Sequence, residues 1–479
     1  MKYLGIWDFI WVPMYLLLIH YLSNRVPRNR IDENPEYAYY RRGFLAKIYG
    51  GLAFAFIYIF YYDGGDTTAY WIDAGRLAGL ITSEPLCFFR ILGGDLSMQW
   101  FYCFDLSNGT PVHYLRDPQA YAVTRFTSLF HFLSVDSFLG CTLLISWVSF
   151  GGIWRLYRVF CEEYPKLSRE LAFAFLFIPS VIFWGSGIMK DTFTFTAACW
   201  MTSSVYGLLL KRRDVFKNLV FVMFSAYVMI SMKPYVFVAL LPGIFIWIVF
   251  NRIQTIQNQI IRLMTAPIIM MLGVVGAAVV FSQASSSLGS YGSVDSIMER
   301  AVATQEDLKR EAYKGNTFDI GTIDPSVTGM LTKSPVAIFA GLFRPTLLDV
   351  RNPVMLISAL ENTALMVFLL YMLFKIGPVS FARYVFSKPM ILFSFTFAII
   401  FSFAVGLTTA NFGSLVRYKI PALPFFLASL YMIRYSQQRD RYGDDFSDTK
   451  RLEEEDFKQA QKPRPPFLPK PYGPAGDYR

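Results

Sequence analysis

Charged residues are scarce in this chain of 479 residues. Asp, Glu, Lys and Arg make up 17% of it, whereas hydrophobic residues make up 54% and aromatic residues 18%. A water-soluble fold with so few charges would struggle to cover its surface with polar groups. The composition therefore excludes an ordinary water-soluble protein and indicates that most of the surface faces lipid.

Histidine and cysteine are also few, and neither is spaced as a metal site requires. The histidines lie far apart, at positions 20, 113 and 131, and the cysteines are scattered over positions 87, 103, 141, 161 and 199. No zinc or haem site is predicted. Cys87 and Cys103 share one loop, and the sequence leaves open whether they form a disulfide or remain two thiols.

The net charge of +10 does not indicate a nucleic-acid-binding protein. The Lys and Arg residues form short clusters between apolar runs and no continuous stripe, so we predict no nucleic-acid partner. Nothing resembling a domain linker precedes the last 45 residues. We therefore expect one transmembrane domain over residues 1–434.

Apolar runs long enough to cross a bilayer recur along the chain, since a spanning helix needs about 20 mostly apolar residues. The first lacks a cleavage site after it and is interpreted as a retained anchor. We predict an all-α, polytopic bundle of about 11 spanning helices. The runs cover residues 5–22, 48–62, 137–154, 170–188, 192–210, 218–232, 235–250, 264–281, 353–374, 389–408 and 420–433.

Every second connection between these runs is rich in Lys and Arg. The first three lie at residues 25–42, 155–169 and 211–217. The positive-inside rule places such connections in the cytoplasm and the short N-terminus outside. Two long loops, residues 63–136 and 282–352, are then extracytoplasmic, and we expect function there. The Pro-rich segment 435–479 is predicted to be a disordered cytoplasmic tail.

The first outer loop begins with two acids, Asp63 and Asp66, separated by two glycines. Asp66 is expected to cap an amphipathic helix that lies along the membrane surface, with Tyr70 on its apolar stripe. An acidic pair at the lipid boundary can act as a general base or hold a divalent cation. The alternative is that Asp66 is only a helix cap and Asp63 only a turn residue.

Other charges are expected near the hydrocarbon. Lys190 and Asp191 lie in a very short outer connection, where they could pair with each other or bind a phosphate. Glu361 lies about two turns inside a spanning run and should face the protein interior, either as a contact between helices or as a substrate ligand. Basic residues at outer helix ends fit an anionic ligand or headgroup anchoring; they are Lys233, Arg344, Arg351, Arg417 and Lys419.

This arrangement resembles the C-type membrane glycosyltransferases, which use polyprenyl-phosphate-linked sugars. The shared features are the acidic pair after a spanning helix, the surface helix behind it, a short outer connection carrying Asp191, and a later long outer loop. The resemblance covers about residues 48–352. Two features depart from that family: the additional helix at 5–22, and the two glycines between the acids, which leave the choice of base open.

The resemblance implies inverting sugar transfer to a lipid, glycan or protein acceptor, on the extracytoplasmic face of a bacterial cell membrane. The catalytic candidates are Asp63, Asp66 and Asp191. The substrate-binding candidates are Tyr70, Lys190, Arg344, Arg351, Glu361 and Arg417. In this scheme a carboxylate deprotonates the acceptor, and basic residues bind the departing lipid phosphate.

Two other functions remain open from the sequence. A polymerase or ligase of surface polysaccharide would use the same lipid but depend more on Arg344, Arg351 and Arg417. A transporter of lipid-linked oligosaccharides would show internal repeats and broken helices, and no convincing repeat is present.

Overall fold

The protein is described by a computed structural model that covers residues 3–28, 30–104, 109, 113–254, 256–257, 292–308, 317–318, 321 and 326–443. Met1–Arg434 form one compact unit, and Tyr435–Arg479 form another. The run at 264–281, most of the segment from 282 to 325, and the tail from 444 onward lie outside the described residues.

The regular structure of the described residues is helical, apart from an isolated bridge between Thr317 and Asn411. The helices of the first half are α1 (Ile6–Arg28), α2 (Tyr40–Phe60), α3 (Asp66–Ser83), α4 (Pro85–Gly93), α5 (Pro118–Ser134), α6 (Phe138–Glu163), α7 (Ser168–Leu176), α8 (Pro179–Phe183), α9 (Lys190–Val205), α10 (Val215–Met232) and α11 (Pro234–Gln254). Those of the second half are α13 (Val294–Leu308), α14 (Val327–Thr332), α15 (Ser334–Phe343), α16 (Pro353–Ile376), α17 (Pro378–Val385), α18 (Pro389–Thr408), α19 (Phe412–Tyr418) and α20 (Ala422–Tyr442). Short turns of 3-10 helix are η1 (Pro35–Tyr39), η2 (Met98–Cys103), η3 (Pro165–Leu167) and η7 (Leu347–Asp349), and η4 (Tyr206–Leu210) is a π-helical extension of α9.

Eight helices of the described residues are long and apolar enough to span a membrane: α1, α2, α6, α9, α10, α11, α16 and α18. The predicted all-α multi-pass bundle is therefore confirmed, with fewer described spans than the eleven expected. α20 carries charged residues in its second half and is not among the eight. It also continues to Tyr442, so the segment 435–442 is helical, in contrast to the disordered tail expected from 435.

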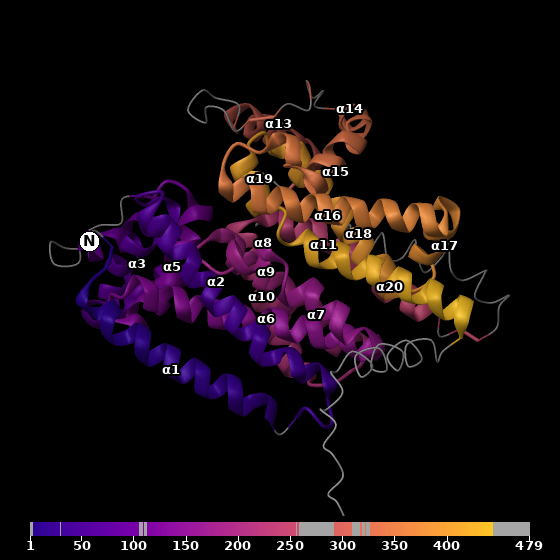
Figure 1. The fold of residues 1–479 in the computed structure, drawn as a ribbon. Helices are drawn as coiled ribbons and strands as arrows, with labels where there is room; N and C mark the ends of the chain where they lie inside the picture. Colours follow the sequence, from indigo (N-terminus) through magenta and orange to yellow (C-terminus); the bar gives the residue numbers. More distant parts are fainter. Residues whose placement is uncertain are drawn as a thin grey trace, which may run out of the picture. The chain divides into compact units, whose positions relative to one another are not determined.

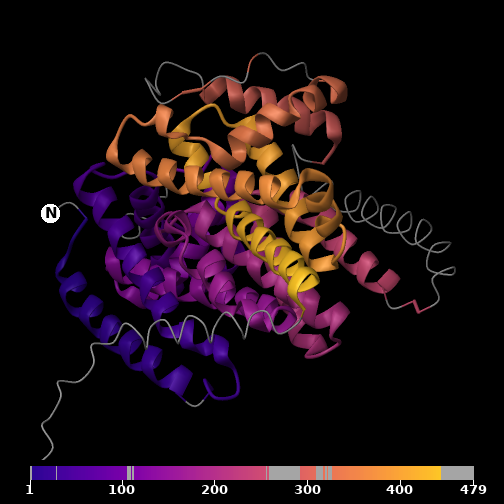
Figure 2. The ribbon, with the colours of Figure 1, turned by 45° about the vertical axis from the view of Figure 1, so that its right-hand side comes forward.

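The long helices pack against one another in both halves of the described chain. α1 packs on α2 and α6, and α6 also packs on α9 (Figure 1). In the second half, α15 and α16 are in contact, and α18 packs on both α15 and α11 (Figure 2). The first outer loop folds as α3 against α4 and α5.

The predicted span at 170–188 is wrong, because this segment breaks into α7 and α8. Ile178 has extended backbone angles, as is usual before a proline, and Pro179 then begins α8. After α8 the chain makes a turn, where a side chain at Gly187 would overlap the ring of Phe54. Hydropathy alone did not reveal this break, because the broken segment is as apolar as a continuous helix.

Lys47 bonds the backbone of α8 and of the turn that follows it. Its buried ammonium on α2 donates to the Val181 carbonyl at 3.2 Å and also to that of Gly185. Ser146 donates to the Ser186 carbonyl at 2.7 Å. Backbone carbonyls in a lipid-facing bundle need such partners within the protein, since no water is at hand.

Ion pairs between the basic connections and nearby glutamates gather at one end of the bundle. At one end Arg213 pairs with Glu162 at 2.7 Å, Lys211 pairs with Glu163 at 3.1 Å, and Arg158 pairs with Glu36 at 3.4 Å. The three compact basic connections at 25–42, 155–169 and 211–217 therefore meet here, and we call this the Glu162 end. α9 and its extension η4 lead from this end to Lys190 and Asp191, which lie at the opposite end.

Replacing Lys47 by Met should destabilise the bundle. The substitution keeps the side chain's approximate length but removes the side-chain donor to the Val181 carbonyl and leaves the Gly185 carbonyl only the long bond from Ser149, at 3.4 Å. Each buried group left unsatisfied costs about 1–3 kcal/mol. The midpoint of thermal unfolding in detergent should fall. Lys375→Met is the control, because Lys375 is exposed and, among the described residues, its hydrogen bond is to Tyr371 on its own helix. An equal effect of the two variants would contradict this role of Lys47.

Candidate functional site

The first outer loop presents Asp66 at the start of α3. Three successive residues, Asp63, Gly64 and Gly65, have positive φ values of 51°, 117° and 133°. The helix is capped by Gly65 and Thr68, whose hydroxyl accepts from the Gly65 amide at 3.1 Å. The expectation that Asp66 is the cap is therefore wrong. Its carboxylate is left available for contacts outside the helix.

The Asp66 carboxylate lies between a phenol and a guanidinium from distant parts of the chain. Its Oδ1 accepts from the Tyr114 hydroxyl at 2.8 Å, and its Oδ2 lies 3.9 Å from Nη1 of Arg417 on α19. The Asp66 side chain is 51% exposed, whereas that of Arg417 is 16% exposed. An accessible carboxylate is thus held against a largely buried cation.

Tyr70 packs against Tyr114, the residue that donates to Asp66. It is buried on α3, and its ring stacks on that of Tyr114 with centroids 4.4 Å apart. Burial, and next the negative charge of Asp66, raises the pKa of both phenols. Tyr114 therefore remains protonated at neutral pH and is the donor in its bond to Asp66. In this structure Tyr70 is a packing residue beneath the site, with no exposed face for a substrate.

Asp63 differs from Asp66 in having no hydrogen bond or ion pair with the described residues. It is exposed in the turn after α2. No group of three or more His, Cys, Asp or Glu within the described part of the chain is arranged to hold a metal ion. A divalent cation at the acidic pair would need ligands from a substrate or from water.

Lys190 and Asp191 do not pair with each other. Lys190 lies 3.4 Å from Asp117, and Asp191 lies 2.5 Å from Lys233 at the junction of α10 and α11. The second pair is buried, and the Lys233 ammonium also lies 3.9 Å from the ring centroid of Tyr418. Each residue of this short connection therefore ties α9 to a different segment.

The charged residues at this end of the bundle form one neighbourhood, which we call the Asp66 end. It consists of Asp66, Tyr114, Asp117, Lys190, Asp191, Lys233, Arg417 and Tyr418. Adjacent residues of α19 join its two halves, because Arg417 faces Asp66 and Tyr418 covers Lys233.

Lys419, the next residue, is buried and turns to the other side of α19. Its ammonium donates to the carbonyls of Leu342 at 3.3 Å and Arg344 at 3.0 Å, and to the side-chain oxygen of Asn362. Glu361 beside it accepts from the Ser180 amide of α8 at 2.8 Å. Glu361 thus faces a neighbouring helix, as its position in the sequence suggests, and is separate from the Asp66 contacts.

The two remaining arginine candidates do not contact Asp66. Arg344 lies 3.8 Å from Asp349 in its own loop, and its guanidinium lies 5.2 Å from the ring of Phe318. Arg351 is exposed and has no ion pair with the described residues. Of the three arginines proposed from the sequence, only Arg417 meets the acidic pair.

Sequence reasoning missed Tyr114, Asp117 and Tyr418. Asp117 had a local signal, because an Asp before a Pro often caps a helix, and its carboxylate does accept from the amides of Gln119 and Ala120. The two tyrosines had no local signal in the sequence. Their importance follows from contacts with residues far away in the chain.

The fold and these contacts define a multi-pass helical membrane protein with a cluster of charges at one end of its bundle. No family model, no curated protein and no solved structure matches this chain.

Replacing Asp191 by Asn should destabilise the protein strongly. Lys233 would remain charged and buried, and removing one partner of a buried ion pair costs about 3–5 kcal/mol. The midpoint of thermal unfolding in detergent should fall sharply. A double variant, Asp191→Leu with Lys233→Met, removes both charges and should regain most of the loss. Equal destabilisation of the single and double variants would show that the pairing is not what matters.

Proposed function

We propose that this protein is a membrane glycosyltransferase that moves a sugar from a polyprenyl-phosphate-linked donor to an acceptor hydroxyl. The observation that carries the proposal is the accessible carboxylate of Asp66, fixed by Tyr114 and Arg417 at one end of a membrane bundle. A general base must be reachable by its substrate and held in one direction, and Asp66 meets both requirements.

Asp66 is the better candidate for the base than Asp63, because only Asp66 is oriented by other residues. In the proposed reaction the acceptor oxygen attacks the anomeric carbon of the sugar as Asp66 takes the hydroxyl proton. The bond from that carbon to the phosphate oxygen breaks, and its electron pair leaves with the lipid phosphate. Attack opposite the leaving group inverts the configuration of the anomeric carbon.

Arg417 and Lys190 are the proposed contacts of the departing phosphate. Each is paired with a carboxylate but remains partly exposed, at 16% for Arg417 and 21% for Lys190. Cationic groups at the leaving phosphate stabilise the charge that develops on it. Asp191 and Lys233 are buried against each other, so we assign them the positioning of α9 and α19 and no contact with substrate.

The proposed face is extracytoplasmic. The compact basic connections meet at the Glu162 end, and the positive-inside rule assigns such connections to the cytoplasm. The Asp66 end then faces the periplasm or cell exterior, which in a bacterium is the side of the cell membrane where lipid-linked sugars are used for envelope glycans. The acceptor class, whether lipid, glycan or protein, is left to the assay.

One observation favours a second candidate, a transporter of lipid-linked oligosaccharides. The segment that contains α7 and α8 is not one continuous helix; the buried Lys47 bonds the backbone of α8 and the turn after it, and the partly buried Glu361 accepts from the Ser180 amide at the start of α8. Broken helices with ionisable residues inside the membrane are common in transporters. Movement of a labelled polyprenyl-linked sugar across vesicles without bond formation would support this candidate.

Replacing Asp66 by Asn should lower the rate of sugar transfer by about 100-fold or more, as expected for loss of a general base. The measurement is transfer of radiolabelled sugar from a panel of polyprenyl-phosphate donors to membrane acceptors, with the protein reconstituted in vesicles. Asp63→Asn is the matched control and should retain most of the activity. Equal loss in both variants would contradict the assignment of the base, and full activity of Asp66→Asn would contradict the proposed mechanism.

A further inference from the structure

Helix α4 of the first outer loop has apolar side chains on two faces. Its inward face, with Cys87, Phe88 and Ile91, is buried against α3 and α5. On its outward face the side chains of Leu86 and Phe89 are 65% and 63% exposed. Burying such side chains away from water is worth about 1.5–3 kcal/mol each, so their exposure indicates a surface that does not face water.

The last four carbonyl groups of α4 accept hydrogen bonds from the protein itself, as a helix end in lipid requires. Normally water satisfies some of the last four carbonyl groups of a helix. Here the carbonyls of residues 90 and 91 accept from the backbone amides of Gly94 and Asp95. The buried guanidinium of Arg125 on α5 donates to the carbonyls of Ile91 at 3.3 Å and Leu92 at 3.2 Å.

Tyr227 of α10 completes the set, because its hydroxyl donates to the Gly93 carbonyl at 2.9 Å. All four terminal carbonyls of α4 therefore have a partner in the protein. Inside a bilayer a carbonyl without a partner costs several kcal/mol, so complete bonding of this kind is a requirement there.

The contact with Tyr227 also shows at which level of the candidate spanning helix α10 the end of α4 lies. Tyr227 precedes the end of α10 at Met232 by five residues, which is about 7.5 Å along a helix axis. α10 is long and apolar enough to span the membrane, and on it Val220, Met223 and Phe224 are exposed. The end of α4 therefore meets α10 within the candidate spanning segment, next to apolar side chains that the described protein leaves exposed.

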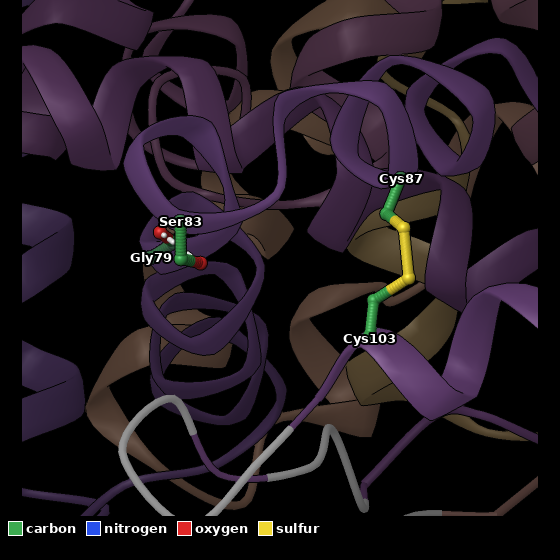
Figure 3. The surroundings of a disulfide bond; sticks show 4 residues. All are labelled: Gly79, Ser83, Cys87 and Cys103. Atoms are coloured by element: carbon green, nitrogen blue, oxygen red, sulfur yellow. Dashed lines mark hydrogen bonds between the residues drawn. A yellow bond between two sulfur atoms is a disulfide. The ribbon is translucent and has the colours of Figure 1, made fainter.

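A disulfide fixes α4 in this position. Cys87, on the inward face of the helix, is bonded to Cys103 at the end of η2 (Figure 3). The alternative of two free thiols is thus not what the structure shows. The disulfide ties α4 to η2 within the first outer loop, and beside it α3 ends with the Ser83 hydroxyl bonded to the Gly79 carbonyl at 3.2 Å (Figure 3).

From these contacts we infer that α4 is immersed in the bilayer at the Asp66 end, with Leu86 and Phe89 among the acyl chains of that leaflet. The sequence predicts that the helix of Asp66 lies along the membrane surface, but the apolar stripe of α3 is buried against protein. α4 takes the position at the membrane surface instead. The inference does not depend on the proposed transferase activity; it implies that the loop bearing Asp66 is anchored at the lipid surface.

Photo-crosslinking in the full-length protein tests this inference directly. p-Benzoylphenylalanine would replace Leu86 or Phe89, one at a time, in protein reconstituted in vesicles of phosphatidylethanolamine and phosphatidylglycerol. Met223, 66% exposed on α10, is the lipid-facing control, and the exposed Glu299 on α13 is the water-facing control. Illumination at positions 86 and 89 should add the mass of one phospholipid, in a yield comparable with position 223, and position 299 should show no such adduct.

Two outcomes would overturn the inference. Absence of lipid adducts at both 86 and 89, with adducts at 223, would show that α4 faces water. Crosslinks from 86 and 89 to a second copy of the chain would show that the face is covered by protein. Both sites are exposed, so the substitutions should leave the fold intact, and the intact Cys87–Cys103 disulfide, checked by mass spectrometry, controls for it.

Discussion

A charge in apolar surroundings needs a partner, and three consecutive residues at the end of α19 and just after it show how this protein meets that requirement. Arg417 faces the carboxylate of Asp66, Tyr418 covers the ammonium of Lys233, and Lys419 bonds to Asn362 and to backbone carbonyls. Isolated charges inside a membrane protein are costly. The paired charges therefore hold the first outer loop, α9 and the later helices in one arrangement, and the candidate site exists only in that arrangement.

The need for a partner also distinguishes charged residues that hold the fold from one that a substrate can reach. Asp191 and Lys233 are buried and bonded to each other, so they are unavailable to a substrate. Asp66 has similar partners but keeps half of its side chain exposed. Lys47 satisfies backbone carbonyls of α8 and of the turn after it, and Arg125 and Tyr227 satisfy those at the end of α4. Exposure combined with orientation distinguishes Asp66 from the other acids of this end.

Hydropathy was enough to predict the helical membrane fold, because a long apolar run has few alternatives in lipid. The sequence also suggested that Asp66 and an outer arginine lie together, and Arg417 does contact it. It could not show that Lys47 bonds the carbonyls of Val181 and Gly185, because that contact joins segments far apart in the chain. Nor could it choose among the arginines, or find Tyr114, because those contacts join segments far apart in the chain. What could be predicted depended on local pattern, and what could not depended on tertiary pairing.

The central claim is that Asp66 and Arg417 form one site for a lipid-linked phosphate. The most direct test is an electron cryomicroscopy map of the protein in lipid nanodiscs with added polyprenyl phosphate. The account predicts phosphate density within hydrogen-bonding distance of Arg417 or Lys190, on the side that Asp66 faces. A map with Asp66 and Arg417 far apart, or with the phosphate bound at another part of the bundle, would contradict it.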